Sequence, residues 1–391
     1  MKTETDLLII GAGPFGLAVA ADATHRGMNY RIVGKPMEFW IANMPKGMYL
    51  RSACDWHLDP AGIDTIESFL KSQHLTAAQV EPVSLDFYLR YAAWFQQRKG
   101  IEPLPLRVSR LDHAAPAGAF EAFGEDGSII TARNVVIAIG FKYFKHLPAD
   151  IAQRVPSGRL AHTCDLVEFG PLRGRRCLII GGRQSAFEWA ALIAEAGASA
   201  VHVCHRHDSP AFKMSDWSWV GPLVDATAQD TTWFRKLPAA RQEDMRQRLW
   251  AEGRLKIEPW LEPRIHNHPI KLWPRSELTA CTERADGSLA ATLDNGETLH
   301  VDQVIAATGY KVDLARVPFL AEGNLKDRLA TRNGFPELDD HFETNVAGLF
   351  MTSMPATQDF GPFWAFTVSA RVSAQILGRR LSGDAVKRAA L

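Results

Sequence analysis

The chain has 391 residues, 46% of them hydrophobic, and its 44 basic residues balance 44 acidic ones, so the formal net charge is zero. This length suggests roughly two or three domains, each with a sizeable core. A balanced charge gives no electrostatic basis for binding nucleic acid or an anionic membrane. The five cysteines are scattered and form no CxxC pair, which favours reduced thiols and argues against a catalytic dithiol.

The first predicted elements are a strand, a glycine-rich turn and a helix. The aliphatic run over residues 7–10 predicts a buried strand, and an apolar segment that stops at Gly27 predicts the helix. Between them lies the turn, which comprises Gly11, Ala12, Gly13, Pro14, Phe15 and Gly16. Because the turn divides the apolar stretch, we expect no membrane span, and the polar start of the chain predicts no leader peptide.

The same order of elements recurs later in the chain. An aliphatic run over residues 177–180 precedes a second turn, and the apolar segment behind that turn stops at Gly197. The second turn comprises Gly181, Gly182, Arg183, Gln184, Ser185 and Ala186. In such units the glycines permit a tight turn and the close approach of a pyrophosphate, while the helix N-terminus offers free N–H groups. Two units therefore predict two dinucleotides and electron transfer between them.

Each unit also closes in the same way, with a hairpin turn before a buried strand that ends at a glycine. Residues 125–131 lead to the strand that ends at Gly140, and residues 294–299 lead to the strand that ends at Gly309. This duplication predicts an α/β fold with two Rossmann-like dinucleotide-binding domains, the second inserted into the first.

Both units depart from the usual dinucleotide-binding pattern at residues that are expected to contact the nucleotide. In the first unit the second strand ends at Gly34 and Lys35, where an acidic residue for the ribose hydroxyls is expected, so backbone groups or Lys35 must hold that ribose. In the second unit Arg183 stands where the third glycine is expected, and Arg206 follows the second strand. An arginine after that strand suits a 2′-phosphate and therefore favours NADPH over NADH.

The two turns, together with the segment 307–310 and the inserted second domain, resemble the flavoprotein monooxygenases. That group includes flavin-containing monooxygenases, N-hydroxylating lysine and ornithine monooxygenases and Baeyer–Villiger enzymes. The segment 157–162 is similar to their FxGxxxH linker signature, although Pro156 and Leu166 replace its aromatic residues. The run over residues 34–60 is similar to a subgroup that includes FAD-dependent urate hydroxylases.

The resemblance implies an FAD domain over residues 1–165 and 316–391 and an NADPH domain over residues 166–315, with a Trp-rich insertion at 207–275. The pyrophosphate of FAD is expected on the first turn. Beyond that turn, the residues expected at FAD are Lys35, Trp40, Arg51, Ser52, Gly140, Phe360 and Gly361. Beyond the second turn, the residues expected at NADPH are Arg206, Thr308, Gly309 and Tyr310.

The activity implied by the resemblance is the insertion of one oxygen atom of O₂ into a small amine or planar heterocycle, through a C4a-(hydro)peroxyflavin that forms after NADPH has reduced the flavin. Two alternatives stay open: an FAD-dependent reductase or oxidase that inserts no oxygen, and a nucleotide-sensing protein without catalysis. The expected partners are a small-molecule substrate and O₂, with neither nucleic acid nor membrane, and assembly into a homo-oligomer stays open. We expect a cytoplasmic location.

His57 beside Asp55 is the candidate pair for proton transfer, and an ordinary polar contact between them is the alternative. His162 either orients a cofactor or fixes the linker between the domains. Two pairs of histidines with HxH spacing have no nearby set of cysteines or carboxylates, so we expect no metal site.

Overall fold

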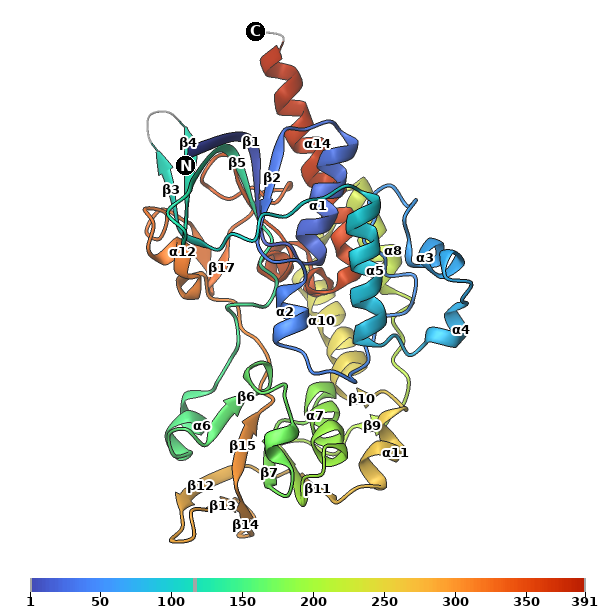
Figure 1. Ribbon diagram of the computed structural model, residues 1–391, viewed down its shortest axis with the longest axis vertical. Helices are drawn as coiled ribbons and strands as arrows, with labels where there is room; N and C mark the ends of the chain where they lie inside the picture. The colour runs from blue at the N-terminus through green and yellow to red at the C-terminus, as the bar shows by residue number, and fades with distance from the viewer. Residues whose placement is uncertain (1, 115–117, 390–391) are drawn as a thin grey trace.

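The computed structural model describes residues 2–114 and 118–389, with side chains up to residue 383, and divides the chain into two units that lie one above the other (Figure 1). Each unit is built on a central sheet of mainly parallel strands with helices packed against it. The predicted α/β fold with two Rossmann-like units is therefore confirmed.

The first sheet has the strand order β2–β1–β5–β4–β3, and β18 pairs with β5. Its strands are β1 (Lys2–Ile10), β2 (Tyr30–Val33), β3 (Val108–Ala114), β4 (Ala119–Gly124), β5 (Ile129–Ile137) and β18 (Leu349–Met351). β1 runs parallel to β2 and β5, and Ile10 lies opposite both Val33 and Ile137. These strands are apolar on both faces near their carboxyl ends because both faces are covered. The carboxyl ends therefore meet at one edge of the sheet, directly before the first glycine turn.

The second sheet is parallel throughout and has the order β11–β8–β7–β15–β6. Its strands are β6 (Leu160–His162), β7 (Arg176–Ile180), β8 (Ala200–His205), β11 (Ile270–Pro274) and β15 (Gln303–Ala306). A separate antiparallel sheet consists of β12 (Leu278–Glu283), β13 (Leu289–Leu293) and β14 (Thr298–Val301). The hairpin of β13 and β14 corresponds to that of β4 and β5 in the first unit, as the duplication predicted.

The longer helices are α1 (Pro14–His25), α5 (Leu85–Arg98), α7 (Gln184–Glu195), α8 (Val220–Gln229), α10 (Ala239–Arg254) and α14 (Ala370–Ala389). The shorter ones are α2 (Glu38–Ala42), α3 (Ile66–Ser72), α4 (Ala77–Val80), α6 (Ala149–Arg154), α9 (Trp233–Lys236), α11 (Leu261–His266), α12 (Pro318–Ala321) and α13 (Thr357–Phe360). Two pairs of two-residue strands complete the fold: β9 (Ala211–Phe212) with β10 (Lys256–Ile257), and β16 (Thr331–Arg332) with β17 (Phe335–Pro336).

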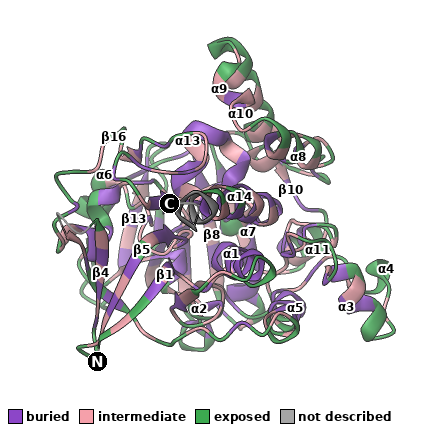
Figure 2. Cartoon of the chain, turned by 90° about the horizontal axis from the view of Figure 1, so that it is seen from above, coloured by how far each residue is buried: buried purple, intermediate pink, exposed green. Residues whose placement is uncertain are grey.

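The core of the first unit is organised around α1, which packs between the sheet and α14 (Figure 2). All residues of α1 from Pro14 to Ala23 are buried. A helix that is covered on every side has no polar face to spare, which explains why its sequence reads like a membrane segment. Among the described residues, no helix combines the length and apolarity that crossing a bilayer requires.

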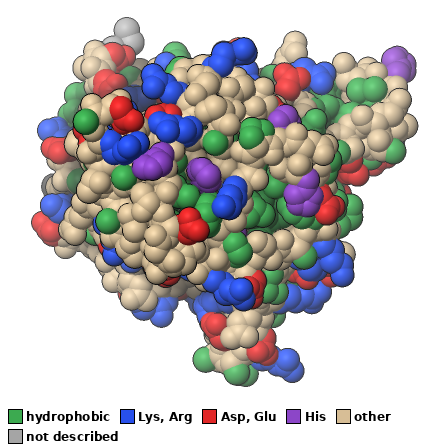
Figure 3. Space-filling view, turned by 90° about the horizontal axis from the view of Figure 1, so that it is seen from below, with side chains coloured by type: hydrophobic (Ala, Val, Ile, Leu, Met, Phe, Trp, Pro, Cys, Tyr) green, Lys and Arg blue, Asp and Glu red, His purple; other side chains and the backbone are tan. Residues whose placement is uncertain are grey.

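The Trp-rich insertion is divided between the two units. Val220 and Val224 of α8 are part of the first unit's core, whereas β10 and α11 contribute Ile257 and Leu261 to the core around α7. β6 lies before the predicted domain boundary at residue 166, yet it pairs in the second sheet. On the face seen from below, charged side chains of both signs are interspersed, in keeping with the balanced composition (Figure 3).

Candidate functional site

The first glycine turn lies at the carboxyl end of β1, and its three glycines have different surroundings. Gly11 has a φ of +112°, and a Cβ there would overlap the carbonyl oxygen of Ala138 at the end of β5. A Cβ at Gly16 would overlap the Gly11 carbonyl oxygen. Gly13 precedes α1 in an extended conformation, and a Cβ there would meet no atom within 4 Å beyond its chain neighbours. The turn is therefore closed by packing at Gly11 and Gly16 and open at Gly13.

A cavity of about 1030 Å³, part of it open to solvent, begins at this turn. The predicted site residues that line it are Gly11, Ala12, Gly13, Pro14, Phe15, Lys35, Trp40 and Gly140. It is also lined by Ser353 and Thr367, from the C-terminal part of the chain. The fold thus gathers residues from β1, β2, β5 and the C-terminal segment around one space.

Sequence reasoning missed a charged cluster in the wall of this cavity. Glu38 in the first turn of α2 accepts a hydrogen bond from Arg107 at 3.1 Å and another from Lys142. Burial alone would raise the pKa of Glu38, but the hydrogen bonds and charges of Lys142 and Arg107 outweigh burial and hold the pKa below its usual value. Glu38 thus places a carboxylate in the same cavity, on the helix that follows Gly34, where the expected acid is missing. The sequence offered one signal for this role, namely an acidic residue a few positions after Gly34.

Two of the residues predicted at the flavin, Arg51 and Ser52, do not line this cavity. Arg51 instead donates to Glu258 at 2.8 Å and to the carbonyl oxygens of Gly253 at 2.8 Å and Glu252 at 3.1 Å. Its donors are therefore used to hold the C-terminal end of α10. Arg51 joins the first unit to the insertion, a role that depends on partners about two hundred residues away in the sequence.

Phe360 and Gly361 also lie outside the cavity lining. Phe360 is completely buried and stacks on Phe342 with 4.0 Å between ring centroids, beside Trp364. Gly361 has a φ of +109° and lies so close to the ring of Phe363 that a Cβ would approach it to 2.8 Å. These residues form an aromatic core that supports the C-terminal wall of the cavity.

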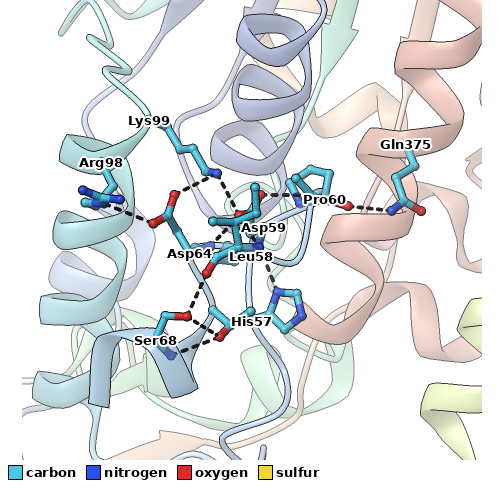
Figure 4. Close-up of polar contacts among 12 residues, drawn as sticks. His57, Leu58, Asp59, Pro60, Asp64, Ser68, Arg98, Lys99 and Gln375 are labelled. Atoms are coloured by element: carbon cyan, nitrogen blue, oxygen red, sulfur yellow. Dashed lines mark hydrogen bonds and ion pairs between the residues drawn. The ribbon is translucent and has the colours of Figure 1, made fainter. Parts of the chain in front are cut away.

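Of the predicted proton-transfer pair, His57 is part of a loop network (Figure 4). The Nδ1 atom of His57 accepts a hydrogen bond from the Asp59 amide at 3.2 Å, and burial lowers the pKa of His57 to about 4. Asp55 is exposed, and in the described part of the chain no hydrogen bond joins its side chain to that of His57. His57 is therefore neutral near pH 7 and supports its loop, and the catalytic role of the pair stays a prediction.

Asp59 is the centre of that network. Its carboxylate accepts hydrogen bonds from three backbone amides and from Lys99, at 2.7 Å, and Lys99 also contacts Asp64 at 2.9 Å (Figure 4). Burial would raise the pKa of Asp59, but the hydrogen bonds from Lys99 and the backbone keep it below its usual value. The network fixes the segment between the glycine turn and α3.

The second glycine turn repeats the geometry of the first at its start. Gly181 has a φ of +145°, and a Cβ there would overlap the carbonyl oxygen of Ala307, as at Gly11. Since β7 ends at Ile180 and α7 begins at Gln184, Arg183 occupies the place of Gly13. The expectation that Arg183 replaces the third glycine is therefore wrong: it replaces the second. Ala186 replaces the third.

The remaining residues predicted for the second site lie around this turn and at the junction of the units. Arg206 follows β8 and is exposed, and His207 packs against Gly182 where a Cβ would lie. The hydroxyl of Thr308 donates a hydrogen bond to the backbone carbonyl oxygen of His146, and Tyr310 packs against Phe141 with 4.9 Å between ring centroids.

His162 lies at this junction, with its Nε2 atom 3.1 Å from the carbonyl oxygen of Gly309. The contact supports the linker role among the two roles considered for it. Within the described residues, no three His, Cys, Asp or Glu side chains are placed to hold a metal ion.

A buried carboxylate behind the second turn connects the two units. Glu188 of α7 is 1% exposed, and burial raises its pKa to about 7. It accepts hydrogen bonds from the Tyr49 amide of the first unit at 3.3 Å, from Gln184 at 3.1 Å and from Arg264 at 3.3 Å. The first turn of α7 is thereby fixed relative to the loop that carries Arg51.

Residues 8–233 match the pyridine nucleotide-disulphide oxidoreductase family, and this match covers more than half of the chain. The chain therefore belongs to that family. Membership is consistent with the two strand–glycine turn–helix units, since both turns fall within the matched residues.

Individual relatives divide between reductases and hydroxylases. A ferredoxin–NADP reductase of a Nocardioides species is 28% identical over 209 residues, which are 52% of this chain and 56% of that protein. An FAD-dependent urate hydroxylase of Xanthomonas campestris pv. campestris is 25% identical over 216 residues, 51% of this chain and 45% of that protein. The chain thus spans about half the length of the curated relatives it matches.

Among solved structures, the ornithine N-hydroxylase of Kutzneria sp. 744, in complex with reduced FAD, NADP⁺ and L-ornithine, aligns with a TM-score of 0.81 at 14% identity. The alignment covers 97% of this chain and 99% of that one. The predicted resemblance to the flavoprotein monooxygenases is confirmed, and at this identity the structural likeness concerns the fold.

Proposed function

We propose that this chain is an FAD- and NADPH-dependent monooxygenase that inserts one oxygen atom of O₂ into a small amine or a planar heterocycle. The observation that carries the proposal is the pair of glycine turns, of which the first opens into a cavity and the second bears arginines. The fold shared with an ornithine N-hydroxylase supports an amine, and the sequence similarity to a urate hydroxylase supports a heterocycle.

The cavity residues fit FAD. The open side of the turn at Gly13 and the N-terminus of α1 suit its pyrophosphate, and Glu38 offers an acceptor for the ribose hydroxyls. The part of the cavity that Trp40 and Ser353 line would take the flavin ring. When bound, FAD would supply the redox and oxygen chemistry, while the protein supplies binding, orientation and electrostatics.

The chain's own residues prepare that space in two ways. Phe39, Phe141 and Tyr310 pack together within 6.2 Å between ring centroids where the second unit joins the first, and their apolar rings exclude water from that side. Trp40 packs against Tyr88 at 4.9 Å between centroids, which holds the indole in the cavity wall. The arginines beside the second turn would attract the phosphates of NADPH.

A reductase without oxygen insertion is the second candidate, because the curated relatives include ferredoxin–NADP reductases. Exchange with a disulfide at this cavity is not supported, since no cysteine is among its lining residues. The two candidates differ in the fate of O₂: a monooxygenase transfers one oxygen atom to the substrate, whereas a reductase or oxidase does not.

The test is to measure NADPH oxidation and O₂ consumption by the flavin-loaded protein against a panel of amines and planar heterocycles. We expect at least one compound to increase the rate and to yield a product whose mass has gained one oxygen atom. Formation of one H₂O₂ per NADPH with every compound would refute the monooxygenase and favour the second candidate. A colourless protein that takes up no FAD would refute both.

A further inference from the structure

Three arginines from separate elements lie around the second glycine turn, and we call Arg183, Arg206 and Arg254 the arginine cluster. Arg183 is the residue before α7, Arg206 follows β8, and Arg254 is the last residue of α10 in the insertion. Within the part of the chain that the structure describes, none of the three side chains has a hydrogen bond or an ion pair with another residue. By contrast, Arg51 forms an ion pair with the buried carboxylate of Glu258, and Arg264 forms one with that of Glu188.

Arg183 lies close enough to Arg254 and Arg206 to feel both charges. Partial burial, followed by the charges of Arg254 and Arg206, lowers the pKa of Arg183 to about 10, although Arg183 still exposes much of its surface to solvent. Burial also lowers the pKa of Arg254. The guanidinium group of arginine keeps its positive charge in proteins at neutral pH. The fold therefore holds three positive charges around one turn, and among the described residues none of the three has an ion pair. An anion bound among them would relieve that repulsion.

Arg254 lies near the second glycine turn because contacts before and after it hold the C-terminal end of α10 in position. Arg51 binds the carbonyl oxygens of Glu252 and Gly253, immediately before Arg254. A few residues later, the amide of Glu258 donates to the side chain of Gln184 at 3.1 Å, next to Arg183. Pairing of β10 with β9 holds the same segment from its other edge. Packing of the insertion thus brings its C-terminal arginine to the N-terminus of α7.

The place itself points to phosphate. Arg183 has the register of Gly13, where the fold normally leaves the backbone bare for a pyrophosphate, and it directly precedes the N-terminus of α7, whose free N–H groups suit an anion. Arginine forms charge-assisted, frequently bidentate hydrogen bonds with phosphate oxygens. A guanidinium at this position can therefore replace the close backbone approach that the missing glycine would have allowed.

We propose that Arg254 completes, with Arg183 and Arg206, a phosphate-binding cluster for the nicotinamide dinucleotide, so that the Trp-rich insertion forms part of the nucleotide site. This inference rests on the proposed function, because it takes NADPH as the ligand of the second unit. It adds a residue that the dinucleotide-binding pattern does not contain and gives the insertion a direct role in binding.

The test measures nucleotide binding without turnover, by calorimetric titration of the flavin-loaded protein with NADP⁺, NAD⁺ and adenosine 2′,5′-bisphosphate. Since hydrogen bonds to charged groups contribute about 1.5–3 kcal/mol, we expect Arg254→Ala to raise the dissociation constant of NADP⁺ at least about tenfold. A loss confined to NADP⁺ and the bisphosphate assigns Arg254 to the 2′-phosphate. A loss shared by NAD⁺ assigns it to the pyrophosphate, and both results support the cluster.

Arg241→Ala is the matched control, because Arg241 is at the other end of α10, where its nearest carboxylate is Asp244 at 3.8 Å. We expect it to leave all three dissociation constants unchanged. If Arg254→Ala binds all three ligands like the wild type while Arg206→Ala loses NADP⁺, the inference is wrong and the proposed function stands. If the wild-type protein binds no nicotinamide nucleotide, the proposed function fails instead. Thermal unfolding of each variant separates lost binding from lost folding.

Discussion

Replacing Gly13 by alanine separates the folding role of the first glycine turn from its binding role. Gly13 has a φ of −83° and a ψ of −170°, which alanine adopts without strain, and no protein atom beyond its neighbours lies within 4 Å of the added methyl group. The substitution removes a glycine from the unfolded chain, so it should leave stability unchanged or raise it by about 0.4–1 kcal/mol. The methyl group would instead project into the open side of the turn.

We expect Gly13→Ala to weaken the binding of FAD. A pyrophosphate that lies against Gly13 must move away from the methyl group and from the N–H groups of α1, and one lost hydrogen bond to a charged group weakens binding by about 1.5–3 kcal/mol. We therefore expect the dissociation constant of FAD to rise by roughly ten- to a hundredfold for Gly13→Ala. Gly16→Ala is the contrasting variant, because its Cβ would overlap the Gly11 carbonyl oxygen and the fold itself must shift.

The assay is titration of the flavin-free protein with FAD, followed by flavin fluorescence, with thermal unfolding measured on the same samples. Gly13→Ala should melt like the wild type and bind FAD weakly, whereas Gly16→Ala should melt at a lower temperature. If Gly13→Ala retains wild-type affinity for FAD, the pyrophosphate does not lie on this turn and the assignment of the cavity is wrong. If Gly13→Ala unfolds, the open geometry described here is wrong.

Three further variants test the polar contacts. Glu38→Gln should weaken FAD binding about tenfold, because it removes an ionised acceptor from the cavity wall, and an unchanged FAD titration would contradict that role. Arg51→Ala should destabilise the protein by roughly 3 kcal/mol in urea unfolding, since Glu258 would stay buried without its partner, and wild-type stability would refute this. The lowered pKa of Asp59 contributes stability that is present above its unfolded pKa and lost as pH falls through the folded pKa. Asp59→Asn should therefore lower stability at pH 7 and reduce its decline below about pH 4, whereas the same acid dependence as the wild type would contradict the assigned contacts with Lys99.

Where sequence reasoning succeeded, the signal was local. The succession of aliphatic strand, glycine turn and apolar helix predicts a dinucleotide unit because turn conformation, helix start and strand burial each depend on neighbouring residues. The line of cavity residues from Gly11 to Phe15, together with Gly140, followed from that pattern. The hairpins before β5 and β15 were predictable for the same reason.

Where it fell short, the deciding partner was far away in the chain. Arg51 was expected at the flavin, yet its geometry is set by Glu258 and the end of α10. Glu38 was overlooked because its place in the cavity wall depends on hydrogen bonds from Arg107 and Lys142, and only the fold brings these two residues close to it. Such contacts have no periodicity or spacing that a sequence could display.

The sequence by itself determined that this chain folds as two α/β units with a glycine turn in each, because those features arise from contacts among near neighbours. The tertiary structure decided which residues share a cavity, which turn position Arg183 occupies and where the insertion packs. Parallel strands bring their carboxyl ends to one edge whatever their order in the chain, so segments distant in sequence become neighbours only in the folded protein. The arginine cluster is the clearest case, since its third member comes from the end of α10.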